Sequence, residues 1–230
     1  MNKNTQNFEF QFFESNIKTT TNTKHLMTIG LYFGSFNPIH RGHLAIAQYM
    51  YENYHFDAIY FVVSPANPFK REASLLDEYK RLELVQIAIE DKNYFFASDV
   101  EFYMAKPSYT YFTLQKLCFD FPENTYSLIL GSDNVEKIFR WKNNEEILKN
   151  YNIYVYPRKE NVQEISLKNI IYTHPPLLDI SSTMIRERIK KGETIRDLVP
   201  SKVAEVIEKE NLYTLFSKEN TENFTNSRYY

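Results

Sequence analysis

The sequence has few of the residues that build disulfides, metal clusters or membrane spans. It contains one cysteine, Cys118, which excludes a disulfide within these 230 residues, and no Cys/His group has the spacing of a zinc site. The longest purely apolar run, Ala58–Val63, is far shorter than the about 20 residues that cross a bilayer. The segment Met1–Leu26 has no apolar core and no small-residue cleavage site, which argues against a signal peptide. We therefore expect a cytoplasmic protein with no membrane partner.

An excess of charge of one sign is also missing. Lys and Arg number 27 and Asp and Glu 29, so the net charge of −2 excludes a polybasic nucleic-acid binder but leaves room for a local basic pocket. Residues 1–26 and 214–230 are polar, and we expect a weakly ordered extension and a frayed tail there. Residues 27–213 are expected to form a single domain. The sequence does not determine the oligomeric state, and a homo-oligomer is compatible with it.

Short apolar runs alternate with helical patterns across this domain. The runs predict strands at Thr28–Phe33, Ala58–Val63, Tyr94–Ser98, Thr125–Leu130, Ile153–Tyr156 and Ile170–Thr173. Helical spacing predicts helices at His40–Tyr54, Asp77–Glu90, Tyr109–Phe119, Glu145–Asn150, Ser182–Lys191 and Ser201–Asn211. This alternation is typical of an α/β fold, a doubly wound parallel sheet, here with a small C-terminal helical portion. Such sheets bind ligands at the carboxyl ends of their strands.

Capping and amphipathic patterns add detail to three of these helices. In Asp77–Glu90 we expect Leu82, Val85 and Ile89 to face the core, Glu78 and Arg81 to face water, and Ser74 to provide a cap. We expect Gly192 to end one of the last two helices and Ser201 to cap the other.

Glycine is scarce, and its placement points to a ligand site. Only five glycines occur, against an average of about 7%. Two of them fall in Gly34–His43, GSFNPIHRGH, which follows the first strand and opens the first helix. Gly131 ends another strand. Glycines end strands in many proteins, but here they accompany a helix N-terminus, whose free N–H groups suit a phosphate.

Two histidines share the first turn of that helix. His40 and His43 are three residues apart, so they lie on one face and can donate hydrogen bonds to phosphoryl oxygens. A metal pair is the competing interpretation, but no third ligand stands nearby in the sequence. The stretch is neither GxGxxG nor a P-loop, which disfavours hydride transfer and P-loop hydrolysis.

GSFNPIHRGH resembles the signature of the HxGH nucleotidyltransferase superfamily. Four further motifs follow in the order seen in bacterial nicotinate-nucleotide adenylyltransferases, and the resemblance covers about Met27–Tyr213. They are SPANPFK (64–70), PSYTYFTL (107–114), GSDNVEKIFRW (131–141) and ISSTMIRERI (180–189). The resemblance implies transfer of AMP from ATP to nicotinate mononucleotide, with release of pyrophosphate. It also implies Mg²⁺ held mainly by the ATP phosphates, and no dedicated metal ligands in the protein.

The resemblance assigns roles to residues of these motifs. Phosphate contacts and leaving-group stabilisation fall to His40, His43 and Arg186. Nucleotide contacts fall to Gly34, Ser35, Phe36, Gly131, Asp133, Ser181, Ser182 and Thr183. Acceptor contacts fall to Lys70, Ser108, Tyr109, Thr110, Trp141 and Arg158. Plainer roles remain open for several of them, namely helix caps for Ser181 and Asp133, core packing for Trp141, and surface charge for Lys70 and Arg158.

Two departures affect the acceptor side. The family commonly has His before the lysine of the second motif and Asp two residues after the SYT threonine, where this chain has Phe69 and Phe112. Nicotinamide mononucleotide therefore stays open as the acceptor. A non-catalytic nucleotide-binding protein of the same fold is a second alternative, which retention of His40, His43, Thr183 and Arg186 disfavours. Trp141 and the SYT motif disfavour relatives that use phosphopantetheine or a CDP-alcohol precursor, and aminoacyl transfer lacks a tRNA-binding appendage.

Overall fold

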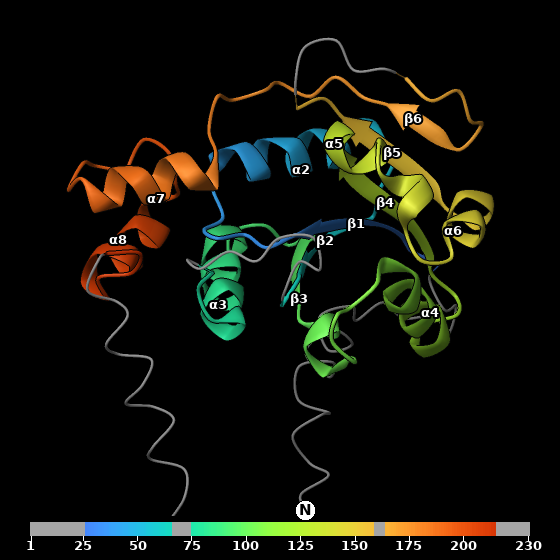
Figure 1. Ribbon diagram of the computed structural model, residues 1–230, viewed down its shortest axis with the longest axis horizontal. Helices are drawn as coiled ribbons and strands as arrows, with labels where there is room; N and C mark the ends of the chain where they lie inside the picture. Colours follow the sequence, from blue (N-terminus) through green and yellow to red (C-terminus); the bar gives the residue numbers. More distant parts are fainter. Residues whose placement is uncertain (1–25, 66–74, 159–163, 215–230) are drawn as a thin grey trace, which may run out of the picture.

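A parallel sheet forms the centre of the computed structural model, which describes residues 26–65, 75–158 and 164–214 (Figure 1). Within these residues the sheet has six strands in the order β3-β2-β1-β4-β5-β6, and every neighbouring pair is parallel. The strands are β1 (Thr28–Gly34), β2 (Ala58–Val63), β3 (Phe95–Ser98), β4 (Thr125–Gly131), β5 (Asn152–Tyr156) and β6 (Ile170–Tyr172). The predicted α/β sheet is confirmed. The strand order reverses between β1 and β4, so a crevice forms at the carboxyl ends of these two strands.

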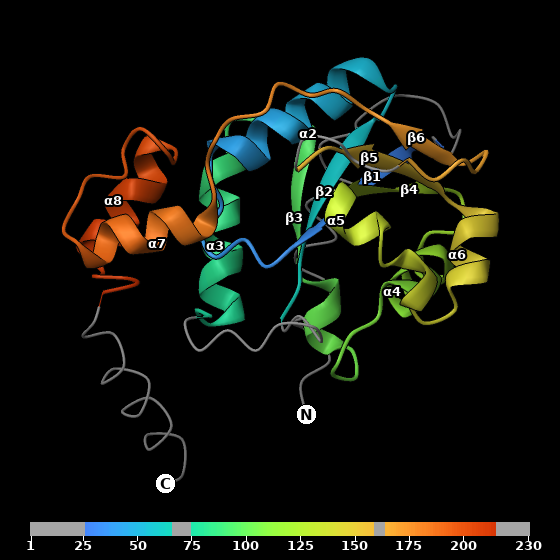
Figure 2. The same ribbon diagram turned by 45° about the horizontal axis from the view of Figure 1, so that its top comes forward.

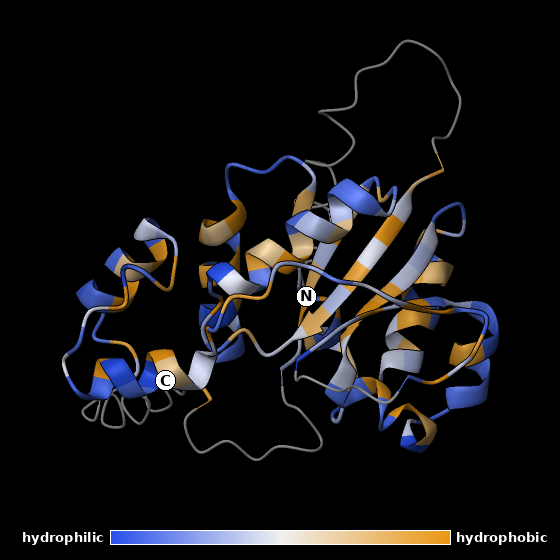
Figure 3. Cartoon of the chain, turned by 90° about the horizontal axis from the view of Figure 1, so that it is seen from above, coloured by the Kyte–Doolittle hydropathy of each residue, from blue (hydrophilic) through white to orange (hydrophobic). Residues whose placement is uncertain are grey.

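Helices cover both faces of the sheet. The helices of the first face are α2 (Arg41–Asn53), α3 (Glu78–Ile89), α7 (Ser182–Lys190) and α8 (Ser201–Lys209), whose apolar residues share one core cluster. Those of the second face are α4 (Thr110–Asp120), α5 (Ser132–Val135) and α6 (Asn144–Asn150). Hydrophobic residues concentrate on the strands and on the helix sides turned towards them (Figure 3). None of the helices in the described ranges is long and apolar enough to span a membrane.

The C-terminal helices reach the far end of the sheet by a long connection. From β6 the chain passes along α2 to α7, and α7 and α8 then lie beside α3 (Figure 2). The hydroxyl of Ser182 fastens this crossing by donating to the carbonyl of Pro38, 2.9 Å away. The start of α7 is thereby placed next to the loop that follows β1.

Most predicted elements are confirmed to within one or two residues, but the caps differ. Asp77 caps α3 by accepting hydrogen bonds from the N–H groups of Tyr79 and Lys80, whereas the predicted cap, Ser74, lies outside the described residues. The prediction for Ser201 is wrong, because Pro200 is the N-cap of α8 and Ser201 begins the helix. Gly192 follows α7 with φ +70°, as a glycine after a helix C-terminus should.

Some predictions fall where the structure is not described, and some elements were not predicted. The extension of residues 1–25, the tail of residues 215–230 and the acceptor candidate Lys70 all lie outside the described residues. The elements that the sequence did not reveal are α5 and the 3-10 helices η1 (Val100–Tyr103) and η2 (Ile138–Arg140). Each is too short to produce a periodic pattern.

Candidate active site

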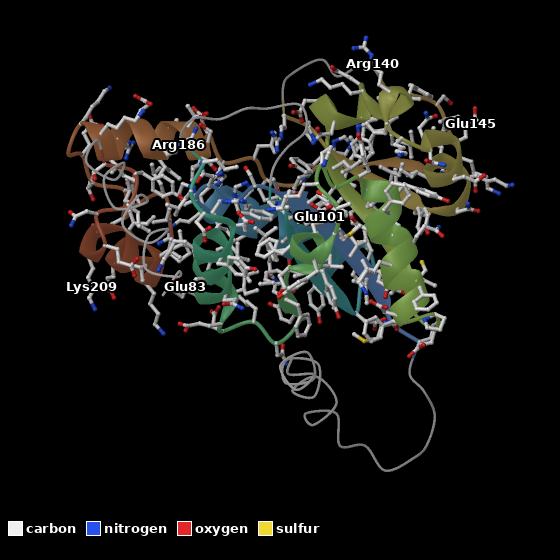
Figure 4. All side chains as sticks on the ribbon, turned by 60° about the horizontal axis from the view of Figure 1, so that its bottom comes forward. Glu83, Glu101, Arg140, Glu145, Arg186 and Lys209 are labelled. Carbon is white, nitrogen blue, oxygen red and sulfur yellow. The ribbon has the colours of Figure 1, made fainter. Side chains whose placement is uncertain are left out.

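A cleft of about 740 Å³ lies at the carboxyl ends of the central strands. Its wall brings together the loop after β1, the Ser108–Tyr111 segment, the segment after β4 and the start of α7. Of the predicted site residues within the described ranges, all but Gly131 line it. The residues that line the cleft come from distant parts of the sequence. Figure 4 labels three of them: Arg186 on α7, Glu101 after β3 and Arg140 after β4. The strand ends therefore gather the motifs that the sequence predicted to act together.

The two histidines lie against each other at the start of α2. His40 is the N-cap, with extended backbone, and its ring stacks on that of His43 with centroids 3.6 Å apart. The N–H of His40 donates to Nδ1 of His43 across 3.3 Å. Since Nδ1 of His43 accepts, the proton of its neutral imidazole lies on Nε2, which is a hydrogen-bond donor.

Burial keeps both imidazoles neutral near pH 7. Together with the charge of Arg158 it lowers the pKa of His40 to about 4, and burial with the charges of His40 and Arg158 lowers the pKa of His43 well below its ordinary value. A side chain at Gly42 would place its Cβ 3.0 Å from Nδ1 of His40, so glycine leaves room for that ring. The pair can therefore present neutral N–H donors without adding positive charge of its own.

The start of α7 is bound to the loop after β1. Ser181 caps α7 by accepting a hydrogen bond from the N–H of Met184. Arg186 is buried and donates to the carbonyl of Asn37 at 2.8 Å and to Oγ1 of Thr183 at 3.4 Å. The cap predicted for Ser181 is thus present, and a guanidinium lies one turn behind it on the cleft wall.

Asp133 and Arg158, predicted to serve different parts of the substrates, form an ion pair. Nε of Arg158 lies 3.4 Å from Oδ1 of Asp133, and its terminal nitrogen donates to the hydroxyl of Tyr156 at 3.0 Å. Gly131 lies beneath this pair, because a Cβ there would come within 2.6 Å of Nε of Arg158 and 2.7 Å of Oδ1 of Asp133. Gly131 thus provides space for the pair and does not itself line the cleft.

Four of the predicted acceptor residues, Ser108, Tyr109, Thr110 and Trp141, also line the cleft. The hydroxyl of Ser108 donates to the carboxylate of Glu101 at 2.9 Å, and Thr113 donates to the same carboxylate. Tyr109 is the N-cap of α4, so the free N–H groups of the first turn of α4 begin at the cleft wall. Trp141 is half-buried, packs against the second core and also lines the cleft, so its packing and site roles are compatible.

Arg81 corrects the sequence prediction for α3. It was expected to face water, yet its side chain is fully buried. Its guanidinium donates to four carbonyls, those of Ser35, Ser64, Pro65 and Leu76, at 2.6 to 2.9 Å. Arg81 therefore joins the loop after β1 to the loop after β2, immediately below the cleft.

The helical spacing of α3 could have predicted that Arg81 is buried. Arg81 stands three, four, seven and eight residues before Leu84, Val85, Ala88 and Ile89, which are all buried. It therefore lies on the apolar stripe of the helix. Glu101 was also missed. Burial raises its pKa, and nothing in the local pattern of a four-residue 3-10 helix signals burial.

The described residues contain no group of three or more His, Cys, Asp or Glu side chains that could hold a metal ion. The guanidinium groups of Arg158 and Arg186 line the cleft together with the histidines, and such groups suit phosphate oxygens. The cleft is therefore arranged to bind anions.

Comparisons with known proteins identify the family. The cytidylyltransferase-like family matches residues 31–188. A probable nicotinate-nucleotide adenylyltransferase of Flavobacterium johnsoniae is 47% identical over 191 residues, covering 81% of this chain and 99% of the relative. A probable nicotinate-nucleotide adenylyltransferase of Cytophaga hutchinsonii is 45% identical, covering 82% of this chain and 99% of the relative.

A solved structure shares the fold. The Plasmodium falciparum nicotinic acid mononucleotide adenylyltransferase complexed with NaAD has a TM-score of 0.69 at 23% identity, covering 82% of this chain and 98% of that one. The bacterial relatives match at much higher identity and over nearly their whole length, which confirms the resemblance seen in the motifs. This chain belongs to the nicotinate-nucleotide adenylyltransferase family, within the cytidylyltransferase-like proteins.

Proposed function

We propose that the cleft transfers AMP from ATP to nicotinate mononucleotide, giving nicotinate adenine dinucleotide and pyrophosphate. One observation carries this proposal: the same cleft is lined by the stacked rings of His40 and His43 and by the acceptor residues Ser108 and Trp141. The first group suits a triphosphate, and the second offers a flat aromatic face to a pyridine ring. Two anionic substrates would thus meet at the carboxyl ends of β1 and β4.

The nucleophile needs no general base. It is a phosphate oxygen of nicotinate mononucleotide, which is already mostly ionised at pH 7 because the second pKa of such a phosphate is about 6. This oxygen forms a bond to the α-phosphorus of ATP as the bond to the bridging oxygen breaks, and pyrophosphate leaves with the electron pair. The protein has to align the phosphates and stabilise the charge that develops on them.

We assign the alignment of the phosphates and the stabilisation of their charge to two elements beside the cleft. His40 and His43 contact the α- and β-phosphates, and Nε2 of His43 donates a hydrogen bond. The start of α7 receives the β- and γ-phosphates through Ser181, Ser182 and Thr183, and its positive dipole end and Arg186 stabilise the leaving pyrophosphate. The hydroxyl of Ser182 already donates to Pro38, so its contribution there is its backbone N–H.

Mg²⁺ enters with ATP in this proposal. We expect phosphate oxygens and water to hold this ion. When bound, the ion neutralises phosphate charge.

The remaining residues serve the nucleotide and the acceptor. Backbone N–H groups at Ser35 and Phe36, beside Gly34, approach the nucleotide, and Asp133 contacts ribose hydroxyls. Trp141 stacks on the pyridine ring, and the Ser108–Thr110 segment lies at its edge. Arg158, paired with Asp133 near the histidines, contributes to the phosphate environment and is a candidate for the mononucleotide phosphate.

The test is pyrophosphate release from ATP and Mg²⁺ by the purified protein with nicotinate mononucleotide as acceptor. We expect His43→Ala to lower kcat by about two to three orders of magnitude, because it removes a donor to the reacting phosphate. His174→Ala is the matched control, since His174 is exposed and does not line the cleft. Turnover of His43→Ala equal to that of the control would reject the assignment of the histidine pair.

The same assay separates the alternatives for the acceptor. Preference for nicotinamide mononucleotide would keep adenylyl transfer and change the acceptor. Absence of release with either acceptor would favour the non-catalytic alternative. A cytoplasmic location and a homo-oligomer stay predictions.

A further inference from the structure

A lysine cation lies at the acceptor end of the cleft, held by aromatic rings. Nζ of Lys142 lies 5.1 Å from the centroid of the Tyr109 ring and 4.9 Å from that of the Phe112 ring. Lys142 directly follows Trp141, and Lys142, Trp141 and Tyr109 all line the cleft. This exposed cation therefore lies between the start of α4 and the residue proposed to stack on the pyridine ring.

The aromatic rings position this cation without neutralising it. Cation–π contacts use the ring faces and supply no negative charge. Among the described residues, no carboxylate lies within ion-pair distance of Nζ of Lys142. Phe112 stands where the family commonly has Asp, and a carboxylate there would compete for the ammonium. The charge of Lys142 thus remains available to a ligand.

We propose that Lys142 is a specificity-determining residue that selects the acid form of the acceptor by binding the carboxylate of the nicotinate ring. This inference rests on the proposed function. The acid and amide forms differ at one ring substituent, which is charged in nicotinate and neutral in nicotinamide. An ammonium beside that substituent attracts the charged carboxylate more strongly than the neutral amide.

The other cations that line the cleft are less suited to this discrimination. Among the described residues, Lys137 and Arg140 make no cation–π contact with Tyr109 or Phe112, the rings that hold Lys142. Arg158 is engaged by Asp133 and by the hydroxyl of Tyr156. Arg186 is buried at the start of α7, beside the proposed triphosphate site. Lys142 shares its wall with Tyr109 and Trp141, the residues proposed to enclose the pyridine ring.

The first experiment measures binding directly. Trp141 is the only tryptophan in the sequence, so its fluorescence reports on the acceptor end of the cleft in the full chain. We would titrate wild type, Lys142→Met, Lys142→Arg and Lys149→Met with nicotinate mononucleotide and with nicotinamide mononucleotide. Lys149 is the matched control, because it is an exposed lysine on α6 that does not line the cleft.

We expect Lys142→Met to raise the Kd of the acid form about tenfold and that of the amide form less than about threefold. Lys142→Arg should restore most of the preference because it keeps the charge, and Lys149→Met should behave as wild type. Steady-state assays should show the same change in the ratio of kcat/KM values, carried mainly by KM. The preference of the wild type for the acid should also weaken as salt is raised.

The outcomes separate this inference from the proposed function. If wild type prefers the acid and Lys142→Met keeps that preference, Lys142 is a surface lysine with a structural cation–π contact, and adenylyl transfer stands. If wild type binds both forms equally, the inference is likewise overturned. If wild type neither binds nor adenylylates either acceptor, the proposed function fails, and the inference fails with it.

Discussion

Replacing His40 should make the stability of the protein less sensitive to acid. Burial and Arg158 lower the pKa of His40 to about 4 in the folded state, whereas an unfolded histidine has a pKa of about 6.5. As the pH falls below about 6.5, the unfolded chain takes up a proton that the folded chain excludes. The unfolded state is then favoured, so this contribution to stability is lost progressively between about pH 6.5 and pH 4.

The size of the effect follows from these two pKa values. At pH 8 the side chain is neutral in both states and contributes almost nothing to the pH dependence. At pH 4.5 the difference in proton binding corresponds to about 2.5 kcal/mol of destabilisation. His40→Asn removes this titration, and asparagine suits the N-cap position that His40 occupies.

Urea denaturation of wild type and His40→Asn at pH 8 and pH 4.5, without ligands, measures this difference. Between the two pH values wild type should lose about 2.5 kcal/mol more free energy of unfolding than the variant. Carboxylates that titrate in the same range affect both proteins and cancel in the comparison. If the two proteins lose the same free energy, within about 0.5 kcal/mol, then His40 is not held neutral by its surroundings.

Two further substitutions test the structure on either side of the cleft. Arg81→Met should lower the free energy of unfolding by about 3 to 5 kcal/mol, because buried carbonyls of Ser35, Ser64 and Pro65 lose their donor. Urea denaturation measures this loss, and a loss below about 1 kcal/mol would mean that these hydrogen bonds of Arg81 do not hold the two strand ends together. Trp141→Ala should raise the acceptor KM about tenfold with little change in kcat, because stacking on the pyridine ring is lost. An unchanged KM in the pyrophosphate assay would mean that the pyridine ring binds elsewhere.

The strands and most helices were predictable because each produces a local signal. Strands buried on both faces, such as Ala58–Val63, are continuous apolar runs, and the long helices have apolar positions at a regular spacing. The site was predictable for a related reason. Three of its motifs, at 34–43, 64–70 and 131–141, directly follow strands, and a parallel sheet brings the carboxyl ends of its strands to one edge.

The contacts that the sequence did not reveal join residues far apart in the chain. The ion pair of Asp133 and Arg158 links two strand ends, and the sequence around either residue does not predict its partner. Arg81 was expected to be exposed because of its charge, although its spacing placed it on the buried face of α3. Its compensating carbonyls come from loops up to 46 residues away, so the sequence could not show how the buried charge is satisfied.

The buried guanidinium of Arg81 joins the residues that directly follow β1 and β2, Ser35 and Ser64, into one support. Ser35 and Ser64 accept hydrogen bonds from the same nitrogen of that side chain, and both residues line the cleft. Groups that are already ordered lose little conformational entropy when a ligand arrives. The cleft is thus preorganised on this side, since the ordering of these two positions takes place during folding and does not weaken the binding of either substrate.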